Sequence, residues 1–292
     1  HKLIYLLRNE ITEIYLAHAI RSFALAMISV FIPIFLLQQG YGLLDVGFYF
    51  IIENIFLFLF VKKIISFSEI KWIKWSIAIS APLTILFFLA LYNIEPIIQL
   101  IGRLGTLAII SALSIIAGMF YYMGFHIDFS KMHEAKKSAR QVGALPVISV
   151  LLSLASHILV AIIITSSGFK TVFLINAALI IIGVVPLLFS AEIHEPIQAK
   201  TSSIFTKKEF KKNMPYIGEG IRYYAAAIYW PVLLYLLAIN LKEMGGIFMA
   251  GNALLALFSG YLGKISNEKN QHRILNFGTA LHGISLFVRT LF

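Results

Sequence analysis

Residues 192–215 read EIHEPIQAKTSSIFTKKEFKKNMP and form a markedly polar stretch in a very apolar chain. Of the 292 residues, 59% are hydrophobic and 13% are charged, and the mean hydropathy is +0.86. A soluble domain has about 25% charged residues. Lipid must therefore be the solvent for most of this chain. The polar stretch is predicted to be a linker between two membrane-embedded parts, residues 1–191 and 216–292.

Apolar segments recur on both sides of this linker, and their length is close to the roughly 20 residues that a helix needs to cross a bilayer. They show no alternation with a period of two, so helices are favoured over barrel strands. We therefore expect an all-α, polytopic membrane protein with six spans before the linker and three after it. The expected spans are 16–38, 43–66, 73–93, 97–125, 141–165, 170–190, 216–240, 245–264 and 274–292.

The net charge of +10 would suggest nucleic acid in a soluble protein, but here it has a simpler explanation. Apart from arginines inside the spans, the lysines and arginines lie at alternate loops, and only Lys170 and Lys242 lie on the opposite side. Positive charge gathers on cytoplasmic loops. We expect a multi-pass protein of the cell (plasma) membrane with a cytoplasmic N-terminus and no nucleic-acid partner. The basic run 207–213 is expected to touch anionic lipid.

The two parts of the chain carry a weak internal repeat. Residues 20–26 read IRSFALA, and residues 221–227 read IRYYAAA. A proline and then an asparagine follow each segment at nearly the same spacing. These are Pro33 and Pro231, and Asn54 and Asn252. Both segments run from the cytoplasmic side outward, so the predicted repeat is parallel.

Parallel six-helix halves joined by a basic inner loop resemble the major facilitator superfamily of secondary transporters. Three segments carry local likeness: 121–131 (YYMGFHIDFSK) to the inner end of the family's fourth helix, 140–143 (RQVG) to the start of the fifth, and 260–264 (GYLGK) to the loop after the eighth. Lys264 stands where the family has an acid. The resemblance implies a small-molecule solute, alternating access, and a chain that holds nine of twelve helices.

Ionisable side chains inside spans are costly, at about 2.5–3.5 kcal/mol, so each is a candidate site residue. Glu53 could carry a proton or balance a cationic substrate, or it could be a neutral or paired residue that holds helices together. Arg21 and Arg222 could face one cavity and grip an anionic group with two hydrogen bonds. Alternatively, each could extend to the inner interface. Arg21 could also pair with Glu53.

Other polar residues in the spans have weaker interpretations. His157 could relay protons, or it could be a hydrogen-bonded packing residue. Asn54 and Asn252 could line the substrate path, or they could bond between helices as Asn176 could. We also expect salt bridges that close the cytoplasmic side in one transport state, although a solvated loop is an equal alternative. The inner-gate candidates are His126, Asp128, Lys131, Arg140, Lys264 and Arg273.

Several chemistries have no support in the sequence. Cysteine is absent, so no disulfide or thiolate metal site is expected. We find no glycine-rich phosphate loop, nucleophile triad or HExxH motif, and we expect no enzyme, cofactor or metal site. The predicted function is secondary-active transport of a small solute, with protons as a candidate coupling ion. The alternative is a non-transporting protein of the same fold, receptor-like or an assembly factor; a membrane-embedded transferase is a weaker third.

Overall fold

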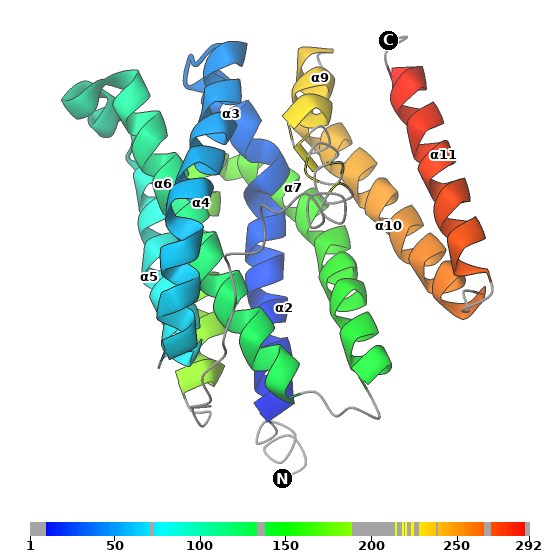
Figure 1. The fold of residues 1–292 in the computed structure, drawn as a ribbon. Coiled ribbons are helices and arrows are strands. Elements are labelled where there is room, and N and C mark those ends of the chain that lie inside the picture. The colour runs from blue at the N-terminus through cyan, green and yellow to red at the C-terminus, as the bar shows by residue number, and fades with distance from the viewer. Residues whose placement is uncertain are drawn as a thin grey trace.

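The computed structural model describes residues 10–70, 73–132, 138–188, 214, 218, 220, 223–224, 228–237, 239–265 and 270–289. These residues form helices and short connections, without a strand among them (Figure 1). The elements are α2 (Glu10–Ile28), the 3-10 turn η1 (Ser29–Phe31), α3 (Ile32–Gln38), α4 (Leu43–Ile70), α5 (Ile73–Tyr92), α6 (Ile94–Met132), α7 (Ser138–Leu188), α9 (Trp230–Leu236), α10 (Leu241–Ile265) and α11 (Gln271–Arg289). The predicted linker at 192–215 lies almost entirely outside the described residues.

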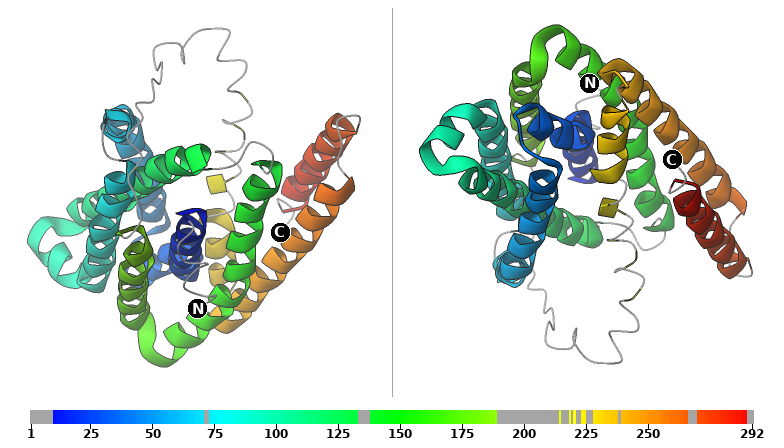
Figure 2. Two further views of the ribbon diagram at one scale, coloured as in Figure 1. Left: turned by 90° about the horizontal axis from the view of Figure 1, so that it is seen from below. Right: turned by 90° about the horizontal axis from the view of Figure 1, so that it is seen from above.

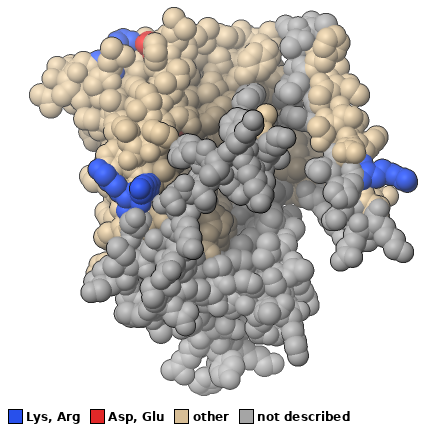
Figure 3. All heavy atoms as spheres, in the orientation of Figure 1, with Lys and Arg blue, Asp and Glu red and all other residues tan. Residues whose placement is uncertain are grey.

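Within the described residues, six helical segments are long and apolar enough to cross a membrane: Leu16–Gln38, Leu43–Ile65, Trp75–Tyr92, Ile94–His126, Leu154–Val185 and Leu241–Phe258. α11, where a ninth span is predicted, is not among them. Large apolar side chains cover the outside, as with Leu44 at 80% and Leu100 at 83% exposure. In Figure 3 the described surface shows few charged side chains. An outside of this kind is stable in lipid, and the chain is an all-helical membrane protein in its described parts.

Two of these segments contain a glycine with a non-helical backbone: Gly102 in Ile94–His126, with φ 75° and ψ 170°, and Gly168 in Leu154–Val185. The break at Gly168 divides α7 into two helical arms. Gly168, inside α7, has φ 79° and ψ 171°, a backbone conformation that residues with a Cβ rarely adopt. The arms on either side of Gly168 are seen joined by this turn in Figure 2. They correspond to the separately predicted spans 141–165 and 170–190. The sequence therefore located this turn to within a few residues.

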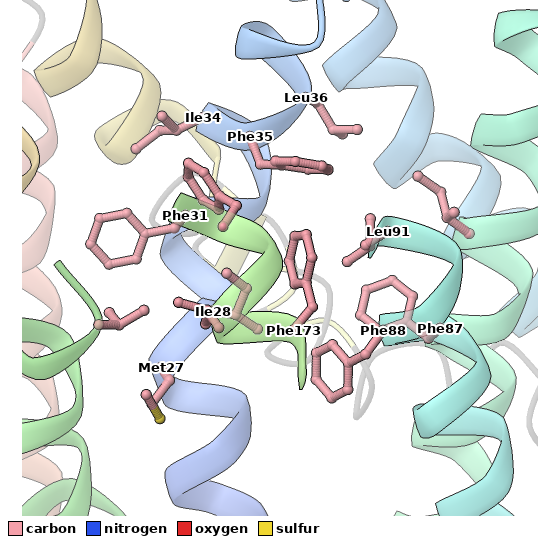
Figure 4. Packing of buried hydrophobic residues seen from close by; sticks show 14 of the residues in the cluster. Met27, Ile28, Phe31, Ile34, Phe35, Leu36, Phe87, Phe88, Leu91 and Phe173 are labelled. Atoms are coloured by element: carbon pink, nitrogen blue, oxygen red, sulfur yellow. The ribbon is translucent and has the colours of Figure 1, made fainter. Parts of the chain in front are cut away.

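α2 lies in the middle of the helices, with α4, α5 and α6 on one side and α10 and α11 on the other (Figures 1 and 2). It packs on α7, and α5 packs on both α6 and α7. Aromatic side chains fill the contacts. The Phe35 ring lies 4.9 Å from that of Phe173 (Figure 4), and it lies 5.1 Å from that of Phe169. Since lipid is as apolar as these side chains, close packing rather than exclusion of water holds the helices together.

Small residues allow the closest helix contacts. At Gly183 in α7, an added Cβ would lie 3.2 Å from Cγ2 of Ile20 in α2. The contact at Gly245 in α10 is tighter. A Cβ there would lie 2.7 Å from the backbone oxygen of His157 and 2.8 Å from Cβ of Ala161, both in α7. α10 can pack at this distance only because residue 245 has no side chain.

α3 and α9 have similar local backbone structure. Each has seven residues and a proline in its first turn. Three positions beyond α3, the amide of Tyr41 donates to the oxygen of Leu36 at 3.1 Å. Three positions beyond α9, the amide of Ile239 donates to the oxygen of Leu234 at 3.2 Å. α4 and α10 begin two residues after these amides, and α3 and α9 contact each other. The stretches around Pro33 and Pro231 are therefore alike in local structure, whereas residues 221–227 lie largely outside the described residues.

Candidate functional site

A cavity of about 740 Å³ lies among the helices and receives side chains from both sides of the linker. α2, α4, α5, α6 and α7 line it from the first part of the chain, and Tyr223, Tyr224, Trp230 and α10 line it from the second. Most of its wall is apolar or aromatic. Its strongly polar or ionisable lining residues, tyrosines apart, are Arg21, Ser29, Glu53, Thr84, Ser114, His157 and Asn252. The sequence singled out four of these seven: Arg21, Glu53, His157 and Asn252.

Arg21 is buried in the cavity wall, with 6% of its surface exposed. Its Nη1 donates to Oγ1 of Thr84 at 3.1 Å, and its Cζ lies 4.1 Å from the centroid of the Tyr121 ring. The Nε of Arg21 is buried and makes no hydrogen bond. The alternative that Arg21 extends to the inner interface is therefore wrong for this structure. The guanidinium is held inside the helices by one neutral hydroxyl and one aromatic face.

A polar cluster that was not predicted from the sequence orients the Tyr121 ring. Nδ1 of His18 lies 3.0 Å from the Tyr121 hydroxyl, and Nε2 of His18 lies 3.3 Å from Oγ of Ser22. The His18 ring also stacks on Phe125, with the centroids 4.4 Å apart. A signal was present: His18 precedes Arg21 by three positions and Ser22 by four, which places them on one helix face. This cluster fixes the platform beneath Arg21.

Glu53 is also buried, with 8% of its surface exposed, and it enters the cavity from α4. Its carboxyl group is hydrogen-bonded by the hydroxyls of Tyr49, one helical turn earlier, and Ser114 in α6. No ion pair joins Glu53 to Arg21 in the described structure, so the pairing that sequence analysis considered is not formed here. Arg21 and Glu53 therefore contact only neutral partners among the described residues, and of the two it is Arg21 that leaves a buried atom, Nε, without a hydrogen bond.

α7 and α10 build the opposite wall. His157 is 5% exposed, and its ring stacks on Phe248 with the centroids 5.8 Å apart. Asn252 follows Phe248 by one helical turn, so both side chains can reach the same face. The close contact at Gly245 lies one turn before Phe248 and holds this wall in place.

Three further candidates lie in the predicted spans: Asn54, Asn176 and Arg222. Asn54 does not line the cavity; its amide donates to the Phe50 oxygen at 2.8 Å and also bonds to Tyr224, which does line it. Asn176 is fully buried, and neither its Nδ2 nor its Oδ1 has a hydrogen-bond partner, against the expectation that it bonds between helices. Arg222 lies outside the described residues.

The inner-gate candidates are described only in part. The His126 ring, toward the C-terminal end of α6, stacks on that of Tyr122 with centroids 6.0 Å apart. Arg273 is exposed near the start of α11. The positions of Asp128, Lys131, Arg140 and Lys264 are helical, but their side chains lie outside the described part of the structure. The predicted gate salt bridges stay a prediction.

A second arginine, Arg103 in α6, closes the loop between α3 and α4. Its Nη1 donates to the Gly40 oxygen, and its Cζ lies 5.2 Å from the centroid of the Tyr41 ring. The Tyr41 hydroxyl in turn donates to the Arg103 oxygen at 3.3 Å. Burial raises the pKa of Tyr41 above its ordinary value, so this hydroxyl remains a donor at neutral pH. We call Arg103, Gly40 and Tyr41 the loop clasp.

The cavity can bind a solute and neutralise one charge on it. Arg21 offers a cation with unused hydrogen-bonding capacity, and Glu53 offers a group that can take up or release a proton. Within the described residues, no group of three or more His, Asp or Glu side chains could hold a metal ion.

No protein-family model, curated protein or solved structure matches this chain, so its residues and their arrangement alone carry the functional argument.

Proposed function

We propose that the protein is a secondary-active transporter of the major facilitator type that moves a small solute by alternating access. The observation that carries the proposal is the cavity, which combines a buried arginine, a buried glutamate and aromatic walls from both parts of the chain. Ionisable residues buried among spans are costly and commonly mark solute or ion paths. In this proposal the solute binds in the cavity, between the two halves.

The internal repeat supports the same proposal. α3 and α9 share a first-turn proline and the same terminal hydrogen bond, and each is followed by a long helix after the same short connection. Phe50 and Phe248, one turn before the paired asparagines Asn54 and Asn252, both line the cavity. A cavity between parallel structural repeats is the expected location of a substrate site in this class of transporter. The orientation with a cytoplasmic N-terminus, and the location in the plasma membrane, are part of the proposal.

The alternative is a non-transporting protein of this fold that binds its ligand and signals or assembles with it. The two functions differ in one measurable property. A transporter moves solute across a sealed membrane, whereas a receptor-like protein binds it without net movement.

Flux into proteoliposomes, measured for anionic, cationic and neutral solutes with and without a proton gradient, tests the proposal. A plug variant makes the test specific. Gly251 lines the cavity and has open space around its Cβ position, so Gly251→Phe should fill the cavity and abolish flux. Gly246→Phe is the matched control, because Gly246 also has open space but does not line the cavity.

Saturable flux that Gly251→Phe abolishes and Gly246→Phe retains would support transport through this cavity. Absence of flux for all three solute classes, with correctly folded protein, would refute the transporter proposal. Equal flux in both variants would show that the solute crosses the protein by a path outside this cavity.

A further inference from the structure

We infer that the cavity selects a carboxylate with a flat apolar body, and that Arg21 binds the carboxylate group. This inference rests on the proposed function, since it names the solute class that the same cavity would accept. It follows from three properties of the site: the unused hydrogen-bonding capacity of Arg21, the neutral partners of that residue, and the aromatic walls.

The first property is the hydrogen bonding of Arg21. A guanidinium carries five N–H donors and cannot be deprotonated in proteins. In the described structure one donated bond is recorded, from Nη1 to Thr84, and the buried Nε makes none. A buried polar group without a partner costs about 1–3 kcal/mol, and more when the group is charged. The site is therefore stabilised by an acceptor that reaches the Nε side of the guanidinium.

The second property is the charge around Arg21. No carboxylate is among its described contacts: Thr84 is neutral, and Tyr121 offers the face of its ring. A buried cation needs a counter-charge, and the nearest acid of the cavity, Glu53, instead accepts hydrogen bonds from Tyr49 and Ser114. A solute carboxylate would supply both the missing charge and a planar pair of acceptor oxygens, which match the guanidinium edge.

The third property is the shape and chemistry of the remaining wall. Phe50 and Tyr224 meet edge to face with centroids 6.0 Å apart, and Phe248 stacks on His157 on the other side. Aromatic walls favour a flat apolar body because offset stacking adds about 0.5–1.5 kcal/mol per pair beyond area burial. A small inorganic anion would leave these walls without a partner. The structure thus favours an aromatic monocarboxylate over phosphate or sulfate.

Three probes of nearly equal shape test this inference: benzoate, benzyl alcohol and benzylammonium. Binding to the purified protein in detergent is measured by calorimetry, with inorganic phosphate as a fourth probe. We expect saturable benzoate binding at least about tenfold tighter than that of the other three, the factor that one charge-assisted hydrogen bond supplies. Benzylammonium or benzyl alcohol binding as tightly as benzoate, or no benzoate binding, would overturn the inference.

Variants of the two arginines assign the binding to Arg21. Arg21→Gln should lower benzoate affinity about tenfold or more and abolish the preference over benzyl alcohol. Arg21→Lys keeps the charge and loses the planar fork, so it should retain part of the preference. Arg103→Gln is the matched control and should leave benzoate affinity unchanged. Folding is checked by monodisperse elution, and Arg21→Lys replaces Arg21→Gln if the latter aggregates. Unchanged benzoate affinity in both Arg21 variants would overturn the assignment.

The proposed transport function and this inference can fail separately. Arg21-dependent benzoate binding without flux of any solute would refute transport and leave the carboxylate site in place. Flux of a cation or a neutral solute that Arg21→Gln leaves unchanged would support transport and overturn the inference.

Discussion

Arg21 and Arg103 are a matched pair of residues in two different regions of the molecule. Each donates a hydrogen bond to a helix or loop 63 positions away in sequence, and each lies over a tyrosine ring, at 4.1 Å and 5.2 Å respectively. They differ in their remaining bonds. Arg103, at the solvent-accessible end of α6, bonds to a backbone oxygen, and its own oxygen accepts a bond from Tyr41. Arg21 is buried, and its Nε bonds to nothing.

This difference indicates different roles for the same residue type. In the loop clasp, Arg103 and Tyr41 each donate a hydrogen bond to a backbone oxygen and the remaining Arg103 donors are exposed, so its contribution is to stability. The cavity holds a charge that its protein neighbours satisfy only in part, and such a charge costs stability unless a ligand completes it. Substitutions at the clasp should therefore change stability more than binding, and substitutions in the cavity should do the reverse.

The contrast between the cavity and the clasp requires that the cavity walls are closely packed. A substitution at Gly245, where α10 contacts α7, tests this packing. Gly245→Ala places a Cβ at 2.7 Å from a backbone oxygen of α7, which must then move away. We expect a loss of about 3 kcal/mol in unfolding free energy, the upper part of the range for overpacking. Thermal unfolding in detergent measures the effect.

Gly246→Ala is the control for that measurement. The position has the same helix-propensity gain of up to about 1 kcal/mol but open space around the Cβ, so the protein should be unchanged or slightly more stable. Equal melting temperatures for the two variants would mean that the α7–α10 wall is loose and that the cavity is not a built site.

Helix positions were largely predictable from the sequence, because a helix in lipid needs a long apolar run and loops collect charge. The predicted spans begin within a few residues of α4, α5 and α6, and the break between spans 141–165 and 170–190 contains Gly168. The ends of the helices were less predictable. α6 continues past the predicted end at 125 to Met132, because a helix can extend beyond the bilayer into polar sequence.

Side-chain direction was the part that the sequence could not supply. Glu53 and Asn54 are neighbours in sequence, yet Glu53 lines the cavity and Asn54 bonds back to its own helix. Successive residues differ by about 100° around a helix, so only one of the two can face a given partner. Thr84 and Ser114 were missed for the same reason: serine and threonine are common in membrane helices, and only the packing of α5 and α6 brings these two to the site.

The next largest effect is expected at Glu53, the second ionisable residue of the cavity. Glu53→Gln keeps the size and one acceptor oxygen for Tyr49 and Ser114, but it cannot carry a proton. If Glu53 is the proton site, accumulation driven by a proton gradient should fall at least about tenfold, while benzoate binding stays within about threefold. Uptake into proteoliposomes with an imposed gradient measures this.

Glu95→Gln makes the same chemical change at an exposed position in the first turn of α6 and should leave coupling unchanged. Retained coupling in Glu53→Gln would remove Glu53 as the proton site. It would leave the carboxylate inference at Arg21 untouched, since that rests on other contacts.

Arg103→Gln tests whether the clasp contributes to stability. The variant loses the bond to the Gly40 oxygen and the contact with the Tyr41 ring, and we expect a loss of about 1 kcal/mol in unfolding free energy. Lys170→Gln removes an exposed cation that lies 5.5 Å from the Tyr92 ring centroid, without the bond to backbone. Its effect should be smaller than that of Arg103→Gln. Equal effects would show that the clasp bond adds nothing to stability.

The two tyrosines give the smallest and most discriminating test, because Tyr121→Phe and Tyr41→Phe each remove one hydroxyl and keep the ring beneath an arginine. Each should cost about 0.5–1 kcal/mol of stability, the net value of one hydrogen bond. Benzoate affinity should not change in either, since the rings remain. Tyr121→Leu removes the ring and should lower benzoate affinity severalfold, because Arg21 loses its platform. Tyr41→Leu should leave that affinity unchanged, and a similar loss in both leucine variants would mean that the two arginines do not differ in role.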